Sequence, residues 1–501
     1  MFLSTLVLSA LSLFPLVLGQ SSSGHGRYTS SVPFTDAALG DGIQSIVSTL
    51  NNGPNRTHVL SKPIYGVNLG TWLVFEPWMS PGEWESMGGQ VCDDCSTCRA
   101  SEWSLATYLG QEKTNEVFTQ HWETWFTQTE VDEMVRLQLN TVRIPLGFWI
   151  VEGIVDRSHE PYAQGGLQQL IRGLEMLKAA NIAVILDHHA LPGVATPLQM
   201  FAGNCTTIVE FYTDYNYQRA ITWAAVMTYL SHVHPAFSTV FAIEAVNEPI
   251  MDFTQTPDYG RYQTDFVVAV RAVEIALGIV CDTSVLTNTT LWQDPIVTQG
   301  LEAAVPIIIE LTLELGLELP LLESFLPPFN FGGLSSLLNG RAAECLATNF
   351  MNRDWQYSND PSDPVANPAD AAKGPQVYDN HLYFCYGGVA PEATADSYLE
   401  TICTIQRTQQ SAAIGDAPMF YGEWSLCTNF DSNNTFLQQW SDSQKLIYGQ
   451  SAGWIFWSLK MANDSTSAPI QWSYIDAVAA GVMTEDPAAF FNPDICAPYT
   501  S

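Results

Sequence analysis

Two glutamates stand at the ends of apolar stretches that predict buried β-strands. The first stretch, VFAIEAVNEP (Val240–Pro249), ends in Asn247, Glu248 and a proline that cannot continue a strand ladder. The second, PMFYGEWS (Pro418–Ser425), carries Glu423 near its end. Carboxylates at the carboxyl ends of buried parallel strands occupy the place where α/β barrels keep their chemistry. Two of them at one barrel mouth can act as proton donor and nucleophile.

Further polar and aromatic residues end the other predicted strands. They are Glu76, Arg143, His188, His189, His381, Tyr383 and Trp457. In a barrel these side chains converge on one mouth, and the set suits cleavage of a glycosidic bond. One carboxyl group there must stay protonated for the leaving oxygen, and the other must stay ionised to attack the anomeric carbon. Arg143 would lower the pKa of the ionised group, and Trp457 offers a flat apolar face to a sugar ring.

Eight predicted strands position these residues. They are Ile64–Trp78, Asn140–Trp149, Ile182–Ala190, Val240–Pro249, Ser284–Asn288, Val377–Phe384, Pro418–Ser425 and Gly453–Lys460. Helical patterns fall between most of them, at Thr129–Leu139, Leu167–Leu177, Tyr217–Leu230, Asp265–Leu277, Ser397–Gln409 and Phe436–Tyr448. This alternation predicts an α/β fold, a closed (β/α)8 TIM barrel over residues 63–501.

One interval breaks the alternation. Between Asn288 and Val377 the chain is far longer than a single helix requires, so we expect a long insertion between strands 5 and 6, at about 295–375. Its glutamates recur mostly at four- or eight-residue spacing among Leu and Ile, at Glu302, Glu310, Glu314 and Glu318. This pattern predicts an amphipathic helix, either packed on the surface or forming a lid over a substrate, and its carboxylates argue against a membrane span.

The composition limits the partners. The chain has 501 residues, with 19 Lys and Arg against 52 Asp and Glu, for a formal net charge of −33. Such acidity excludes nucleic acid and anionic membranes as expected partners, because both attract cations. A neutral polysaccharide remains a suitable partner. We expect no cofactor, no metal and a monomer.

The N-terminus and the cysteines indicate a secreted glycoprotein. Residues 1–19 are almost wholly apolar and predict a signal peptide, although they lack the usual Lys or Arg, and 20–62 predict a flexible arm. Glycosylation sequons begin at Asn55, Asn204, Asn288, Asn433 and Asn463. Cys92, Cys95 and Cys98 have a spacing that could ligate zinc, but in an oxidising compartment ten cysteines favour disulfides. An extracellular or cell-wall location follows.

Seven stretches, in order, resemble the signature segments of glycoside hydrolase family 5, within clan A. They are YGVNLGTWLVFEPW, NTVRIPLGFW, LDHHALPG, AVNEP, DNHLYF, YGEWS and WIFWSLK, and they span about residues 64 to 460. They are most similar to the fungal exo-β-1,3-glucanase group. The resemblance implies a retaining double displacement, with Glu248 as general acid/base and Glu423 as nucleophile.

The same resemblance implies the supporting roles. Arg143 would support the nucleophile, and His381 and Tyr383 would orient the two carboxylates. His189 matches a histidine of the family's third strand, which leaves His188 as its packing neighbour. Three residues would bind the substrate, Asn247 at the 2-hydroxyl, Glu76 at the non-reducing sugar and Trp457 beneath its ring.

Two features depart from the exo-glucanase pattern and leave the substrate open. LDHHALPG is followed by VATPLQMF, without the usual polar turn, and the acidic insertion and the Cys92–Cys98 loop are atypical. We expect a β-1,3-glucan substrate first, with β-1,6-glucan or a flavonoid diglycoside (rutinosidase-like action) as the alternative. A non-catalytic glucan-binding wall protein is a third hypothesis, but such a protein should lack one of the two carboxylates. No His-Glu-x-x-His motif is present.

Overall fold

Parallel strands that follow one another in sequence order close into a barrel. The computed structural model describes residues 56–282, 284–287, 293–317, 344–353, 367–464 and 468–500. Each strand pairs with the next, and the eighth pairs with the first. The strands are β1 (Ile64–Asn68), β2 (Thr141–Gly147), β3 (Ala183–Ala190), β4 (Val240–Glu244), β5 (Ala347–Met351), β6 (Gln376–His381), β7 (Met419–Glu423) and β8 (Gly453–Phe456). The predicted (β/α)8 TIM barrel is confirmed.

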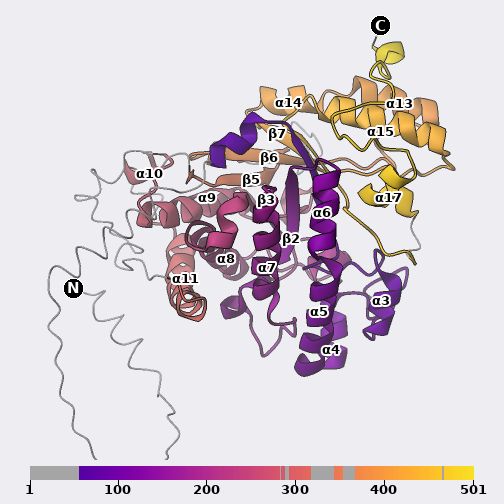
Figure 1. Cartoon of the computed structure of the whole chain (residues 1–501). Helices are drawn as coiled ribbons and strands as arrows, with labels where there is room; N and C mark the ends of the chain where they lie inside the picture. The colour runs from indigo at the N-terminus through magenta and orange to yellow at the C-terminus, as the bar shows by residue number, and fades with distance from the viewer. Residues whose placement is uncertain are drawn as a thin grey trace, which may run out of the picture.

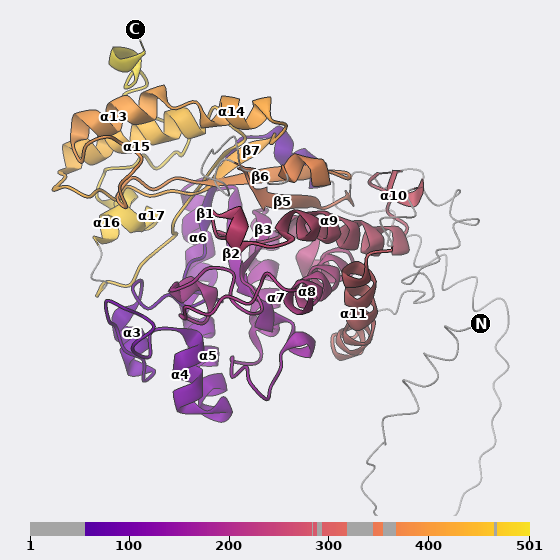
Figure 2. The same cartoon turned by 180° about the vertical axis from the view of Figure 1, so that it is seen from behind.

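Helices surround the strands on all sides (Figures 1 and 2). They are α3 (Pro81–Ser86), α4 (Glu102–Leu109), α5 (Gln111–Trp125), α6 (Gln128–Arg136), α7 (Gly166–Ala179), α8 (Asp214–Val233), α9 (Tyr259–Ala276), α10 (Ser284–Thr287), α11 (Pro295–Glu314), α13 (Ala395–Thr404), α14 (Arg407–Ala413), α15 (Asn434–Tyr448), α16 (Pro469–Trp472) and α17 (Tyr474–Ala479). Helices α3, α4 and α5 were not predicted from the sequence.

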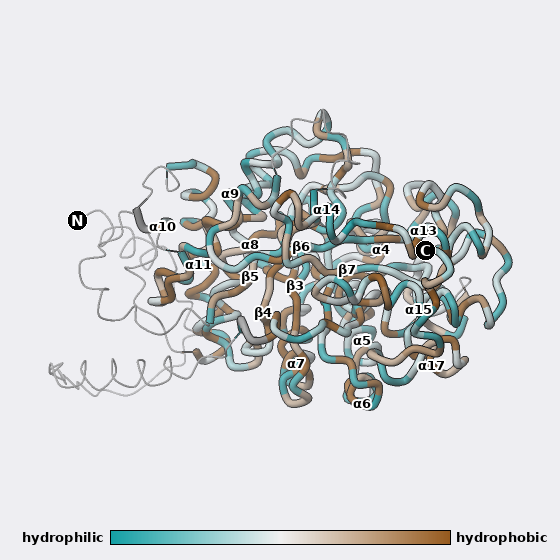
Figure 3. Tube along the Cα trace, turned by 90° about the horizontal axis from the view of Figure 1, so that it is seen from above, coloured by the Kyte–Doolittle hydropathy of each residue, from teal (hydrophilic) through white to brown (hydrophobic). Residues whose placement is uncertain are grey.

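The barrel interior has an apolar lower layer and a polar upper layer. The lower layer consists of Ile64, Ile185, Phe241, Ala242, Ala347, Val377, Phe420 and Ile455, all buried. Successive inward positions on one strand are two residues apart, so Ile185 is followed by Asp187 and Val377 by Asp379. Figure 3 shows the hydrophobic segments gathered in the strands and adjoining helices, with hydrophilic segments mostly at the periphery. The polar layer therefore rests on a packed apolar base.

The prediction of the fifth strand at Ser284–Asn288 is wrong. Ser284–Thr287 forms the short helix α10, and its first backbone N–H is capped by Asp282 Oδ1 at 2.7 Å. The true fifth strand is Ala347–Met351, fully buried and paired with β4 and β6. Its polar Thr348 and Asn349 hid it from a search for apolar runs. The inserted helix α11 consequently lies between strands four and five, not five and six, and the interval 295–375 includes a barrel strand.

Helix α11 is a surface helix packed on α8. It buries Leu301, Ala304 and Ile308 and exposes Glu302, Glu310 and Glu314, as predicted, while Glu318 lies outside the described residues. Tyr229 on α8 and Thr312 on α11 join their hydroxyls at 2.9 Å. By length and composition α11 could cross a membrane, but 44% of its apolar window is buried inside the molecule. This agrees with a packed surface helix.

The prediction of a flexible arm is wrong for Arg56–Ser61. Arg56–Ser61 forms a 3-10 helix, and the buried Arg56 donates to the carbonyl oxygens of Val240 at 2.7 Å and Glu344 at 2.8 Å, and to that of Ser231. This guanidinium ties the chain to the base of the barrel. The predicted signal peptide and the rest of the arm lie outside the described residues.

All ten cysteines are paired, so the prediction of disulfides over zinc is confirmed. The pairs are Cys92–Cys98, Cys95–Cys205, Cys281–Cys345, Cys385–Cys427 and Cys403–Cys496. Two of them, Cys95–Cys205 and Cys385–Cys427, join pairs of loops that follow different barrel strands. Loops of this kind carry the functional residues of TIM barrels, and the disulfides limit how they can move.

Candidate active site

Arg143 lies at the centre of the polar layer. Its side chain is fully buried on β2, and it donates from Nε to Glu244 Oε2 at 2.8 Å and from Nη1 to Glu423 Oε1 at 2.9 Å. It also donates from Nη2 to Asn247 Oδ1 at 2.8 Å, and its Nη1 lies 3.1 Å from Asp187 Oδ2. One guanidinium thereby fixes side chains from the ends of three other strands. Arginine suits this task because its planar group carries five fixed donors.

Glu423 is held by donors on both carboxylate oxygens. Arg143 contacts Oε1, and the Tyr383 hydroxyl donates to Oε2 at 2.8 Å. The preceding Gly422 permits this placement, since a Cβ there would lie 2.0 Å from Asp379 Oδ2. Asp379 Oδ1 instead accepts the Gly422 N–H at 2.7 Å. The YGEW sequence thus fixes Glu423 through its backbone as well as its side chain.

Glu248 faces Glu423 across His381. Nδ1 of His381 lies 2.7 Å from Glu248 Oε1 and 3.5 Å from Glu423 Oε2. One oxygen of Glu248 and one of Glu423 lie within 4.8 Å of each other. The Glu248 side chain is 19% exposed, against 7% for Glu423. The two carboxylates therefore form a close pair in which one member is more open to solvent.

The electrostatics of the polar layer are set by burial and by mutual repulsion. Burial raises the pKa of Asp187 to about 7 and that of Glu244 to about 8, while Arg143 opposes both shifts. Burial also raises the pKa of Glu423, against the lowering effect of His381 and Arg143. Although burial disfavours its charge, His381 has a raised pKa because Glu423 and Asp379 lie beside it. Burial therefore makes these carboxyl groups harder to ionise, and the charges of Arg143 and His381 offset part of that effect.

The two histidines of β3 have separate environments, as predicted. His189 Nδ1 lies 2.6 Å from Asp187 Oδ2, and burial holds the pKa of His189 well below its usual value, so the neutral ring donates to Asp187. His188 stacks on Trp223 with ring centroids 4.0 Å apart, and its nitrogens have no hydrogen-bond partner within the described residues. His188 is a packing residue.

Two tryptophans lie against other predicted site residues. Trp457 stacks near His189 with ring centroids 5.7 Å apart, and Trp78 donates to Glu76 Oε2 at 2.9 Å. Burial raises the pKa of Glu76 to about 8, and the charges of Glu423 and Glu248 add to that shift. All the predicted site residues are thus connected to one cluster by direct contact or by mutual electrostatic influence.

Sequence reasoning missed the lower members of the cluster. Asn68, Asp187, Glu244 and Asp379 are fully buried and contact Arg143 or lie within 3.4 Å of it. A period-two search would have found two of them, because Asp187 precedes His189 by two residues and Asp379 precedes His381 by two.

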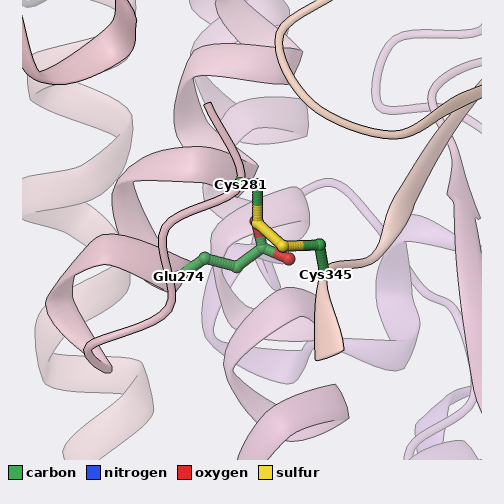
Figure 4. A group of neighbouring side chains, drawn as sticks. All are labelled: Glu274, Cys281 and Cys345. Carbon is green, nitrogen blue, oxygen red and sulfur yellow. A yellow bond between two sulfur atoms is a disulfide. The ribbon is translucent and has the colours of Figure 1, made fainter. Parts of the chain in front are cut away.

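Two groups of side chains in the described residues have metal-ligand geometry. One is Glu248, His381 and Glu423 themselves. The other is Glu274 with Cys281 and Cys345, but Figure 4 shows the two sulfurs joined in a disulfide, which removes the thiolates that would bind a metal. Glu274 instead accepts the Leu346 N–H at 2.8 Å and pairs with Arg271. The second group is a structural junction beside β5.

Comparisons with known proteins agree with this geometry. A family model described as Cellulase (glycosyl hydrolase family 5) matches residues 106–463. The Probable glucan endo-1,6-beta-glucosidase B of Neosartorya fischeri is 30% identical over 459 residues, covering 89% of this chain and 93% of that protein. The Probable glucan 1,3-beta-glucosidase A of Aspergillus clavatus is 35% identical over 189 residues, but these cover only 38% and 42%. The crystal structure of rutinosidase from Aspergillus niger has a TM-score of 0.53 at 16% identity, with 84% and 98% covered.

Substitution of Arg143 tests the electrostatic organisation. Arg143→Gln should lower the free energy of unfolding by about 3–5 kcal/mol at pH 7, because buried carboxylates lose their counter-ion. In the folded state the pKa of Asp187 is raised to about 7 and that of Glu244 to about 8. Such groups lower the free energy of unfolding as the pH rises from about 4 towards those values. Without Arg143 these pKa values rise further, so the loss should shrink at pH 4.

Denaturant titrations at pH 4 and pH 7 measure this loss. Arg136→Gln is the matched control, since Arg136 forms only exposed pairs with Glu133 and Glu485 and should change stability little at either pH. An equal loss at both pH values for Arg143→Gln would contradict the account.

Proposed function

The chain belongs to glycoside hydrolase family 5, and from this premise we propose that it is a secreted, retaining endo-acting glucanase that cleaves β-1,6-glucan. One observation carries the mechanism, namely the pair of Glu248 and Glu423 with oxygens within 4.8 Å. Retention requires carboxyl groups about 5–5.5 Å apart, whereas inversion requires about 6.5–9.5 Å so that water fits between them. The pair supports double displacement.

Glu423 is the proposed nucleophile. It receives donors from Arg143 and Tyr383 and faces the cationic His381, and all three neighbours stabilise its anion. Its ionised oxygen forms a bond to the anomeric carbon while the bond from that carbon to the leaving oxygen breaks. Water later attacks the same carbon, and the Glu423–sugar bond breaks.

Glu248 is the proposed general acid/base. In the first step its proton passes to the leaving oxygen, and in the second step its carboxylate removes a proton from the attacking water. Its greater exposure suits exchange of protons with leaving group and water. His381 contacts both carboxylates and orients them towards one sugar carbon.

The remaining site residues are proposed to bind the sugar. Arg143 donates to Asn247 Oδ1 and so leaves the Asn247 Nδ2 side for the sugar 2-hydroxyl. Glu76, protonated by virtue of its raised pKa of about 8, would pair with a hydroxyl of the non-reducing sugar. Trp457 would form the floor beneath that ring, held in place by His189.

The choice of β-1,6-glucan reverses the order expected from the sequence. Relatives named glucan endo-1,6-beta-glucosidase B match over most of the chain, including that of Emericella nidulans at 29% identity over 447 residues. The relatives named 1,3-beta-glucosidase match over 38% of the chain. β-1,3-Glucan is therefore the second candidate, favoured by the higher identity of that shorter match. The disulfides and the predicted signal peptide support secretion.

The substrate is tested by product profiles on two polymers. The purified protein should release β-1,6-linked oligosaccharides from pustulan about tenfold faster, or more, than it releases sugar from the β-1,3-glucan laminarin. Glu423→Gln is the control for contaminating activity. Preference for laminarin, or release of glucose alone from both polymers, would contradict endo-action on β-1,6-glucan.

The roles of the two carboxylates are tested by leaving-group chemistry. Dinitrophenolate departs without protonation, so Glu248→Gln should form the glycosyl-enzyme from an activated aryl glycoside and then accumulate it, because water lacks its base. A burst of phenol followed by slow turnover is expected, with azide speeding the slow phase. Glu423→Gln should show no burst and lose about 10⁴-fold or more on every substrate. The reverse pattern would exchange the roles.

A further inference from the structure

The backbone of Glu248 lies in a conformation that requires support. Its φ is +41°, in the left-handed region that non-glycine residues rarely adopt, and Pro249 restricts the preceding residue further. Such a conformation persists where surrounding contacts over-determine it. The contact between His381 and Oε1 fixes only the tip of the side chain.

The loop after β3 supplies contacts to the backbone on both sides of Pro249. The Thr196 hydroxyl donates to the carbonyl oxygen of Glu248. The Tyr212 hydroxyl accepts the Ile250 N–H at 2.9 Å and donates to the Ala195 carbonyl at 3.0 Å. Two adjacent residues of one loop are thereby joined to the residues on either side of Pro249.

This loop is itself firmly held. Two backbone hydrogen bonds join the outgoing and returning parts of the loop. The Glu210 N–H donates to the Gly193 carbonyl at 2.7 Å, and the Leu198 N–H donates to the Thr206 carbonyl at 2.9 Å. The Cys95–Cys205 disulfide joins it to the loop after β1. A contact made from this loop is therefore made from a fixed support.

The geometry points to Thr196 as a positioning residue for Glu248, an inference that rests on the proposed role of Glu248 as general acid/base. The hydroxyl of Thr196 holds the Glu248 carbonyl, and so the direction in which the Glu248 carboxyl group leaves the backbone. Placement to within a fraction of an ångström decides how well a proton reaches the leaving oxygen. Thr196 lies in VATPLQMF, where the chain departs from the polar turn of exo-glucanases.

A loss of this support should resemble a weakened general acid. Thr196→Val keeps the shape of the side chain and removes the hydroxyl, so Glu248 can move from its position. Cleavage of aryl β-gentiobiosides with poor leaving groups should fall about 10–100-fold, part of the contribution of a general acid. Cleavage of the dinitrophenyl glycoside should change less than about twofold, since that leaving group needs no proton.

The experiment compares kcat/KM over a series of aryl leaving groups for three variants. Thr196→Ser keeps a hydroxyl and should restore the wild-type dependence on leaving-group basicity. Thr207→Val is the matched control, because Thr207 is exposed in the same loop. Thermal unfolding midpoints of all variants monitor the fold.

The outcomes separate the inference from the proposed function. A steeper dependence for Thr196→Val, with rescue by Thr196→Ser, supports it. An equal loss on all leaving groups indicates direct sugar binding or a structural role and overturns it, as does an unchanged profile. If kcat/KM of Glu248→Gln depends on leaving-group basicity no more steeply than that of the wild type, the assignment of Glu248 as general acid fails. The inference about Thr196 then fails with it.

Discussion

The guanidinium of Arg143, buried inside the barrel, determines how the polar side chains at the barrel mouth are arranged. Removing a charge from water costs several kcal/mol, and only a surrounding set of well-placed acceptors offsets that cost. Arg143 meets this requirement with carboxylates from β3, β4 and β7 and an amide that follows β4. The same contacts fix Glu423 and Asn247, so the stability of the polar layer and the geometry of the proposed reaction have one cause.

The two carboxylates differ in what surrounds them, and that difference supports the proposed division of their roles. Glu423 is enclosed and receives donors on both oxygens, which favours a fixed anion. Glu248 is more open, contacts His381 and is held from the loop after β3. A fixed nucleophile and a solvent-accessible acid/base are what double displacement requires.

Much of this arrangement could be predicted from the sequence, because buried strands that end in polar residues leave a local pattern. Both carboxylates, Arg143 and the barrel follow from such patterns. The fifth strand did not, because Thr348 and Asn349 interrupt its apolar run, whereas Ser284–Thr287, with two apolar residues at its centre, forms a short helix. The contact of Thr196 with Glu248 joins residues 52 positions apart through the shape of a loop, which no local pattern encodes.

The central claim, a double displacement by Glu248 and Glu423, is tested most directly by the configuration of the first sugar released. Proton NMR during the first minutes of β-glucan hydrolysis distinguishes the anomers before mutarotation mixes them. Two successive displacements at one carbon predict that the β anomer appears first. Immediate appearance of the α anomer would mean a single displacement by water, and would contradict the account.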